Sequence, residues 1–216
     1  MKQKMAIHRI KMSQFYLGTM ILKFDLPVSL IDDINKAYDK HNGQMPSYNT
    51  QLAGKIADEK EVNTILNEEM KKTFQTCFDK YVETRPGSVY CMDETKWDCV
   101  PGPCWINEMK SGEYNPTHFH TSISSDMGLS SVLMLKRPDW YGVEASQEEK
   151  PANGYLEFSG GDQSPLSISQ CRVDAQVGEF YVFPYTLLHT VYPFNSTDEV
   201  RRTMSYNCDL IRKKGM

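Results

Sequence analysis

The stretch GEYNPTHFH (Gly112–His120) holds two of the five histidines in this chain of 216 residues. His118 and His120 are two positions apart, so on an extended strand both imidazoles would lie on the same face. A third imidazole, His189, follows later in the stretch FPYTLLHTVYP (Phe183–Pro193). Three such ligands on one side of a metal ion leave its other positions free for substrates. The pattern therefore predicts an open, catalytic metal site rather than a closed structural one.

Composition and charge narrow the classes of function. The net charge is −4 and the pI is about 5.8, and the only run of basic residues is the short tail Arg212–Lys214. These values give no strong signal for nucleic-acid binding. No apolar stretch is long enough to span a bilayer, and none follows the basic amino terminus as in a signal peptide. The six cysteines have no paired spacing. We therefore expect reduced thiols and a cytoplasmic location.

Residues 1–84 are predicted to contribute a strand and two supporting helices. Aromatic and branched residues within 13–24 favour a strand. Pro27 is typical of a helix start, apolar residues then recur at three- and four-residue intervals, and Gly43 suits a left-handed helix cap. A longer apolar stripe predicts a second helix over residues 59–82.

Residues 85–216 differ in composition from the preceding part of the chain, with frequent Gly and Pro between short β-rich segments. The expected strands lie at 88–91, 97–100, 105–109, 130–136, 155–159, 166–169, 179–184 and 201–210. Many short strands at near-regular spacing predict a sandwich or jelly roll, forming one structural domain with the preceding helices. The polar segment 137–153 is long for a loop inside such a domain, so its Trp140 and Tyr141 are candidates for a substrate lid.

Four segments resemble motifs of the 2-oxoglutarate- and iron(II)-dependent oxygenases, in particular the prolyl-4-hydroxylase-like branch and its short members from marine phages. Gly112–His120 is similar to the Gly-x-Tyr-x-x-His-x-Asp approach to the first metal ligand, and Gly154–Phe158 is similar to the Gly-x-Leu-x-Phe strand. The segment from Gly178 to Pro193 is similar to the strand and turn that carry the distal histidine. Arg201–Asn207 resembles the closing Arg-x-Ser strand.

The resemblance implies a mostly β, cupin-like double-stranded β-helix that uses Fe(II), 2-oxoglutarate and O2. The residues that it implies as metal ligands are His118, His120 and His189. The remote carboxylate of 2-oxoglutarate needs a permanently charged, two-pronged donor, and arginine is that donor. On a strand, Arg201 shares its face with Thr203, Ser205 and Asn207.

Two details of the cosubstrate site stay open. Arg202 points to the opposite face from Arg201, and whichever of the two is not the anchor is expected to be a solvated surface charge. Asn107 and Tyr114, which precede the first histidine of the metal site, could also reach the cosubstrate.

The second metal ligand departs from the family pattern, because His120 stands where the family has Asp or Glu. An all-histidine site removes a negative charge, which should weaken iron(II) binding. Asp126, six residues further on, could instead fold back and supply a carboxylate; its alternative role is that of a turn residue beside Gly128.

The implied reaction is oxidation of an unidentified substrate, with hydroxylation of a C–H bond as the main hypothesis. A protein side chain, a free amino acid and a nucleobase are all compatible with the sequence. Two alternatives remain. One is a cupin-like dioxygenase that uses metal without 2-oxoglutarate, and the other is a non-catalytic metal-binding module. If the chain is encoded by a phage, it would act in the cytoplasm of the host cell.

Overall fold

The computed structural model describes residues 18–84, 97–125, 127–143, 151–161, 168–195 and 198–213. Its elements, in chain order, are β1 (Leu22–Asp25), α1 (Val28–His41), β2 (Asp58–Glu61), α2 (Glu68–Thr84), β3 (Trp97–Met109), β4 (Asn115–His118), β5 (Gly128–Lys136), β6 (Leu156–Ser159), β7 (Gln170–Val173), β8 (Glu179–Pro184), β9 (Leu188–Val191) and β10 (Arg201–Arg212). Three short 3-10 turns lie between these elements: η1 (Asn42–Gln44), η2 (Asn49–Gln51) and η3 (Asn63–Ile65).

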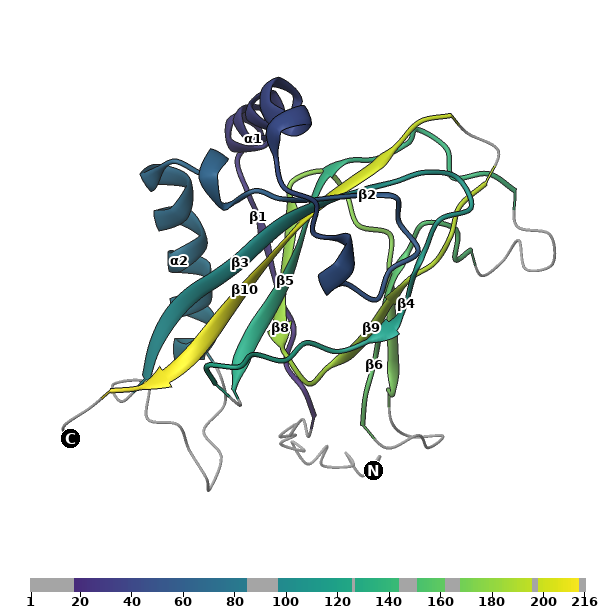
Figure 1. Cartoon of the computed structure of the whole chain (residues 1–216). Coiled ribbons are helices and arrows are strands. Elements are labelled where there is room, and N and C mark those ends of the chain that lie inside the picture. The colour runs from purple at the N-terminus through teal and green to yellow at the C-terminus, as the bar shows by residue number, and fades with distance from the viewer. Residues whose placement is uncertain are drawn as a thin grey trace, which may run out of the picture.

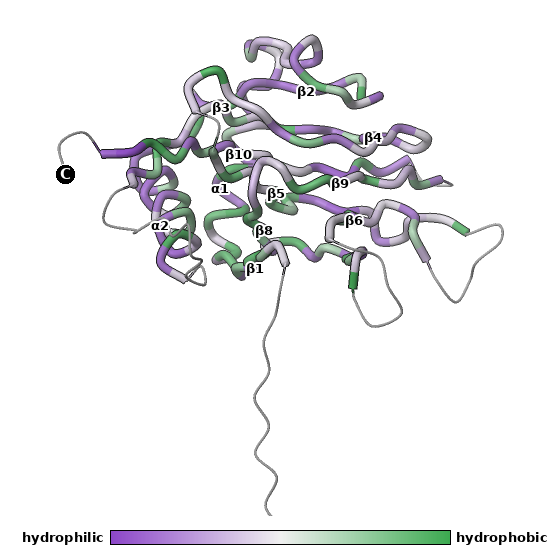
Figure 2. Tube along the Cα trace, turned by 90° about the horizontal axis from the view of Figure 1, so that it is seen from below, coloured by the Kyte–Doolittle hydropathy of each residue, from purple (hydrophilic) through white to green (hydrophobic). Residues whose placement is uncertain are grey.

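The described strands form two antiparallel sheets. The large sheet has six strands in the order β1-β8-β5-β10-β3-β2, and the small sheet has four in the order β4-β9-β6-β7. Figure 2 shows the strands of the two sheets beside one another in these orders, with β2 and β4 near the same edge. β1 and β2 come from the amino-terminal part of the chain and pair directly with β8 and β3. The predicted double-stranded β-helix is confirmed.

The two helices cover the face of the large sheet that points away from the small sheet (Figure 1). The apolar stripe of α2 makes this contact: Phe74 and Phe78 pack edge-on against Phe180 of β8 and Tyr206 of β10, with ring centroids 5.3 to 6.2 Å apart. Side chains of this kind dominate core energetics because each buries a large apolar area. This first core belongs to the helices and the outer face of the sheet.

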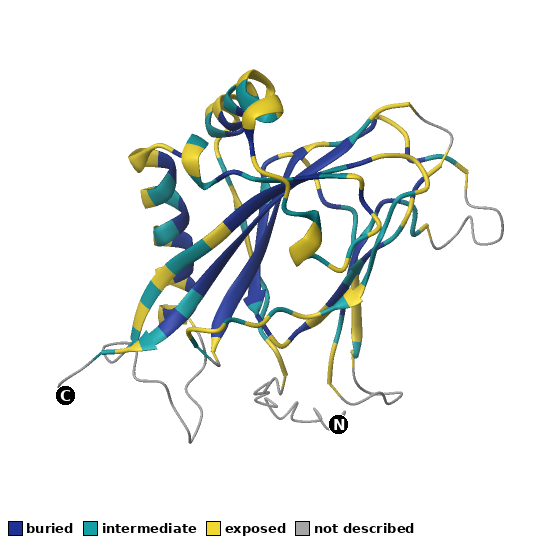
Figure 3. Ribbon diagram, viewed as in Figure 1, coloured by how far each residue is buried: buried dark blue, intermediate teal, exposed yellow. Residues whose placement is uncertain are grey.

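A second apolar core lies between the two sheets. Phe158 of β6 and Phe183 of β8 meet edge-on at 4.9 Å, and Leu156 and Met134 are buried beside them. In Figure 3 the strands β5 and β10, which separate the two cores, are buried along most of their length. The large sheet is therefore covered on both faces, and its inward face forms one wall of the space between the sheets.

The alternation of β10 decides which side chains reach that space. Met204 and Tyr206 belong to the core under the helices. Arg201 is paired with Met109, which belongs to the core between the sheets, and Thr203 is paired with Asn107. Because neighbours on a strand point to opposite faces, Arg201, Thr203 and Ser205 point inward.

The prediction of a helix over residues 59–82 is wrong at its start. Residues 58–61 form the edge strand β2, which pairs with β3, and α2 begins only at Glu68. The side-chain oxygen of Asn67 accepts a hydrogen bond from the backbone N–H of Met70, so a capping residue marks the helix start. Residues 58–61 are all charged, and their pairing with the open edge of β3, rather than the apolar spacing that begins at Val62, sets their structure.

Other boundaries also differ from the prediction. α1 is present as expected, but Gly43 lies within η1 and its φ is not positive, so it is not a left-handed cap. The segments expected at 97–100 and 105–109 are one long strand, β3, whereas the strand expected at 166–169 begins at Gln170. The predicted strand 88–91 lies outside the described residues. None of the helices in the described part of the chain is long and apolar enough to cross a lipid bilayer.

Candidate metal and cosubstrate site

Three histidines from the small sheet and its neighbouring loop meet at one point. His118 ends β4 and is paired with His189 of β9, while His120 lies two residues beyond β4 and is held by its backbone N–H, which donates to the Tyr185 carbonyl. One nitrogen from each ring lies within 4.8 Å of the others, a group that could hold a metal ion. The sequence prediction that the three imidazoles converge is therefore confirmed. Of the two histidines expected on one strand, His118 lies on β4 and His120 lies just beyond its end.

The hydrogen bonds of these rings orient the free nitrogens toward one another. Nδ1 of His118 lies 2.7 Å from the Pro116 carbonyl, and Nδ1 of His189 lies 2.9 Å from the Leu187 carbonyl. A carbonyl can only accept, so both Nδ1 atoms carry the proton and both Nε2 atoms keep a lone pair. This is the arrangement that fixes a histidine as a metal ligand.

Burial keeps these imidazoles neutral. It lowers the pKa of His118, lowers that of His189 to about 3 and lowers that of His120 to about 2, with repulsion among the rings adding to the last two. Nε2 of His120 and Nε2 of His189 are 3.2 Å apart. Two lone pairs at that distance repel unless a cation or proton lies between them, so the donor set fits a divalent metal.

The loop that carries His120 is held by residues that the sequence motifs did not identify. The His120 ring is stacked between Trp105 of β3 at 5.8 Å and Tyr185 at 6.2 Å. The Tyr185 hydroxyl donates a hydrogen bond to Asp209 of β10. A Cβ on Gly128 would lie 2.1 Å from the Tyr185 ring, so only glycine permits this ring position. Tyr185 directly follows the quoted Phe-Pro segment, which was the only sequence signal for it.

Arg201 is buried between the sheets with part of its guanidinium unused. Only 2% of the residue is exposed, its Nε donates to the Gly154 carbonyl at 3.0 Å, and its Nη2 has no hydrogen-bond partner among the described residues. Burial lowers the pKa of Arg201, an effect that neighbouring Tyr141 opposes. An unpaired buried donor of this kind is costly unless a ligand completes it. A carboxylate fits that position.

Arg202 is not the solvated surface charge expected for the unused arginine. It is buried on the opposite face of β10, where its guanidinium donates to Glu108, Asn35 and Asp39 and covers the ring of Tyr38. Every side of this cation is occupied by the helix α1 and the strand β3. Its position leaves Arg201 as the arginine that faces the space between the sheets.

The other expected cosubstrate residues divide into two groups. Thr203, Ser205 and Asn107 are buried on the inward face near Arg201, and Oδ1 of Asn107 has no partner within the described residues. Tyr114 lies elsewhere: its carbonyl accepts the backbone N–H of Lys55, and Lys55 Nζ lies 5.7 Å from the centre of its ring.

The candidate lid is described only in part. Trp140 is half exposed, whereas Tyr141 is buried against Phe194 and beside Arg201. Tyr141 thus belongs to the inner wall, and the Cβ of any larger residue at Gly154 would lie 2.5 Å from its ring. Residues 144–150 and the alternative metal ligand Asp126 lie outside the described residues.

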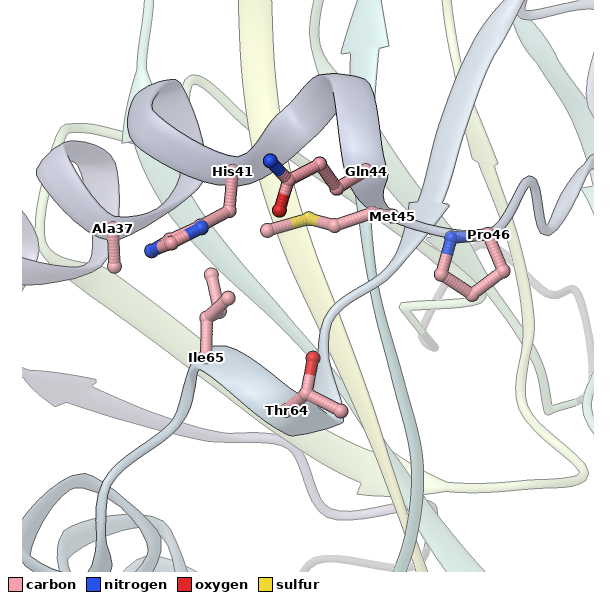
Figure 4. Close-up of a pocket in the computed structure, with 7 residues that line it drawn as sticks. All are labelled: Ala37, His41, Gln44, Met45, Pro46, Thr64 and Ile65. Atoms are coloured by element: carbon pink, nitrogen blue, oxygen red, sulfur yellow. The ribbon is translucent and has the colours of Figure 1, made fainter.

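A surface hollow of about 460 Å³ lies far along the chain from these residues, between α1 and η3 (Figure 4). Its wall consists of Ala37, His41, Gln44, Met45, Pro46, Thr64 and Ile65. Both α1 and this hollow are on the helix side of the large sheet, and none of its residues belongs to the histidine group.

Residues 103–207 match the family model described as "Putative 2OG-Fe(II) oxygenase". The matched segment, just under half of the chain, is similar to that family and includes all three histidines and Arg201. No curated protein matches the chain in sequence. Several solved structures resemble this chain in fold.

A prolyl-4-hydroxylase from Pseudomonas putida has a TM-score of 0.57 and 15% sequence identity to this chain. The match covers 92% of this chain and 94% of the hydroxylase. A prolyl hydroxylase from Trichoplax adhaerens, in complex with a hypoxia inducible factor peptide, has a TM-score of 0.57 and 14% identity, covering 89% and 83%. The viral collagen prolyl hydroxylase of Paramecium bursaria Chlorella virus-1, solved with 2-oxoglutarate, has a TM-score of 0.52 and 15% identity, covering 88% and 96%. This chain therefore shares the fold of these prolyl hydroxylases.

Proposed function

We propose that this oxygenase is a hydroxylase in which His118, His120 and His189 hold iron(II) and Arg201 holds the remote carboxylate of 2-oxoglutarate. The observation that carries the proposal is the open Nη2 of a fully buried arginine on the same inward wall that contacts the histidines. Iron(II) with 2-oxoglutarate supplies oxidation of a C–H bond by O2, with succinate and carbon dioxide as the coproducts.

The histidines contribute orientation and neutrality. Carbonyls hold the Nδ1 protons of His118 and His189, so these two rings present Nε2 without a competing proton at neutral pH. The three ligands carry no negative charge, so the cosubstrate itself must supply anionic oxygen donors to the metal. This makes metal binding and 2-oxoglutarate binding strongly coupled in the proposed site.

Arg201 fixes the other end of the cosubstrate. Thr203 and Ser205 share its face on β10 and offer hydroxyls, and Asn107 lies opposite Thr203. The surrounding wall is buried and partly aromatic, which excludes water and strengthens the carboxylate contact. The alternative cupin-like reaction without 2-oxoglutarate would leave Nη2 of Arg201 with no partner among the described residues.

The chemical class of the substrate is a further part of the proposal. One of the similar structures holds a peptide, and that likeness favours a peptide or protein side chain over a free amino acid or a nucleobase. We also propose a cytoplasmic site of action, since the five cysteines within the described residues are all free, as in a reducing compartment.

The test is anaerobic titration of the apo-protein with iron(II) and 2-oxoglutarate, following the weak visible charge-transfer band of an iron-bound oxo acid. We expect the band in the wild type and its loss in His189→Ala. In Arg201→Met we expect it only at much higher 2-oxoglutarate concentrations. Iron binding without a band would instead support the cupin-like reaction, and absence of iron binding would support the non-catalytic module.

A further inference from the structure

Glu59 is a buried acid with nothing to neutralise it. It lies on the edge strand β2, only 1% of the residue is exposed, and neither of its carboxylate oxygens has a hydrogen-bond partner in the described part of the chain. Buried carboxylates are normally paired or fully hydrogen-bonded, because desolvation of the charge is costly. A buried pair of open acceptors is therefore a feature that a ligand would complete.

The sheet register places Glu59 on the wall of the proposed active site. Glu59 is paired with Asn107, which is paired with Thr203 of β10. Partners in an antiparallel ladder point to the same face, so Glu59 points inward, as Arg201 does. The adjacent inward residue of β3 is Trp105, whose ring stacks on the metal-site residue His120. Figure 1 shows β2 beside β3 at the edge of the large sheet.

The neighbours of Glu59 add further acceptors. A Cβ placed on Gly54 would lie 3.2 Å from Oε1 of Glu59 and 3.5 Å from Oδ1 of Asn115, so these two oxygens flank the same point. Oδ1 of Asn115 and Oδ1 of Asn107 are also buried without partners in the described residues. The buried unpartnered atoms around Glu59 are thus acceptor oxygens, whereas those around Arg201 are its Nη2 donor and the Tyr141 hydroxyl.

The cations near Glu59 in sequence are used elsewhere. Lys60 points to the opposite face of β2 and pairs with Asp58, and Lys55 Nζ lies over the Tyr114 ring. The charged residue that acts on Glu59 is another acid, Glu113. Burial and this repulsion raise the pKa of Glu59 to about 7.

We propose that Glu59, with Asn107 and Asn115, forms a subsite for a cationic nitrogen group of the substrate, an ammonium or guanidinium carried on a side chain. The inference rests on the proposed function only in taking the inward wall as the substrate site. A cation would donate to the open oxygens, neutralise the carboxylate and stand away from the Arg201 end that holds an anion. The segment 52–57, which is tied to Tyr114 by the Lys55 backbone, lies against this subsite at Gly54.

The test compares cationic probes with neutral probes of matched shape. Nα-acetyl-L-lysine amide is matched with the norleucine compound, and Nα-acetyl-L-arginine amide with the citrulline compound. Binding to the full chain is measured by calorimetry, both metal-free and with Mn(II) and 2-oxoglutarate, which allow no turnover. We expect at least one cationic probe to bind ten-fold or more tightly than its neutral match in at least one of these states.

Three variants locate the effect. Glu59→Gln keeps the shape and removes the charge, so the preference for the cation should disappear. Asp58→Asn removes the same charge from the opposite face of β2 and should leave the preference unchanged. Asn115→Leu should weaken the cationic probe a few-fold with little effect on the neutral one, and it serves as the second variant if Glu59→Gln does not fold.

The outcomes are distinct from those of the proposed function. The subsite would be overturned if cationic and neutral probes bound equally, or if neither cationic probe bound in the metal-free state or with Mn(II) and 2-oxoglutarate. An unchanged preference for the cation in Glu59→Gln would also overturn it. Loss of 2-oxoglutarate binding in Glu59→Gln would also overturn it, by placing Glu59 in the cosubstrate pocket. Failure of the wild type to bind 2-oxoglutarate would contradict the proposed function alone, since the cation preference is also measured without it.

Discussion

Arg201 and Arg202 are adjacent on one strand and both are buried, yet their surroundings are opposite. Arg202 faces the helices, where two carboxylates, an amide and a tyrosine ring occupy its guanidinium. Arg201 faces the space between the sheets, where one carbonyl is bonded and Nη2 is open. A paired buried charge maintains the fold, and an open buried charge is available to a ligand. The same contrast separates Asp58, paired with Lys60, from Glu59.

The largest expected effect is on stability and belongs to Arg202. Arg202→Met should lower the free energy of unfolding by about 3–5 kcal/mol, because Glu108, whose side chain is only 13% exposed, then loses its charged partner. Urea denaturation at pH 7 measures this. The contrast between the two arginines would be wrong if Arg201→Met, the matched variant on the other face, cost as much.

Arg201→Met should instead act on the cosubstrate. We expect the dissociation constant of 2-oxoglutarate to rise roughly 100-fold, about 3 kcal/mol, with little loss of stability because the buried donor loses no ion pair. The charge-transfer band under anaerobic conditions reports the dissociation constant, and urea denaturation reports the stability. A normal dissociation constant in this variant would remove Arg201 from the site.

The open, buried carboxylate of Glu59 also predicts how the stability of the protein depends on pH. Its pKa is raised from 4.5 to about 7, so the folded state holds a proton that the unfolded state has lost between those values. Stability from this group is present below pH 4.5 and is lost as pH rises through 7, by about 3 kcal/mol in all. Burial and, after it, repulsion from Glu113 cause this loss, and Lys55 and Lys60 do not offset it because they contact other groups.

Urea denaturation between pH 5 and pH 8 tests this prediction. Relative to the wild type, Glu59→Gln should gain stability across that range, whereas Asp58→Asn should not. Identical pH dependence in both variants would contradict the open status of Glu59.

The smallest expected effect concerns the support of Arg201. Gly154 has φ +71°, and a Cβ there would meet the Tyr141 ring. Gly161→Ala is the matched control, with φ +77° and nothing within 4 Å of the added carbon. We expect Gly154→Ala to cost about 1–2 kcal/mol more than the control and to weaken 2-oxoglutarate binding several-fold. Thermal unfolding and the cosubstrate titration measure the two effects, and equal costs would show that the Tyr141 contact is unimportant.

The strands of the core could largely be predicted, because alternation and turn residues act locally. β8 has the predicted bounds and β5 and β10 differ by at most two residues at an end. The prediction failed where partners distant in sequence compete with local preference. The four charged residues 58–61 directly precede the apolar spacing that begins at Val62, but they pair with the free edge of β3, and this pairing decided their structure.

The residues of the candidate site also divide into those that local sequence patterns predicted and those that they did not. The spacing of His118 and His120, and the distal motif of His189, identified the metal-binding group before any coordinates. Tyr185, Asp209 and Glu59 were not identified, because their importance depends on contacts across the sheets that no local pattern records. Tyr141 was expected on an exposed loop and is instead part of the inner wall beside Arg201.

The sequence by itself determined the jelly-roll class, the order of the oxygenase motifs and the convergence of three histidines. These follow from residue type and spacing, which set strand faces directly. Only the tertiary structure decided which of two neighbouring arginines is open, and that a buried glutamate lies unpaired on the same wall. Burial and pairing depend on what the rest of the fold places opposite each side chain, and that information is not local to the chain.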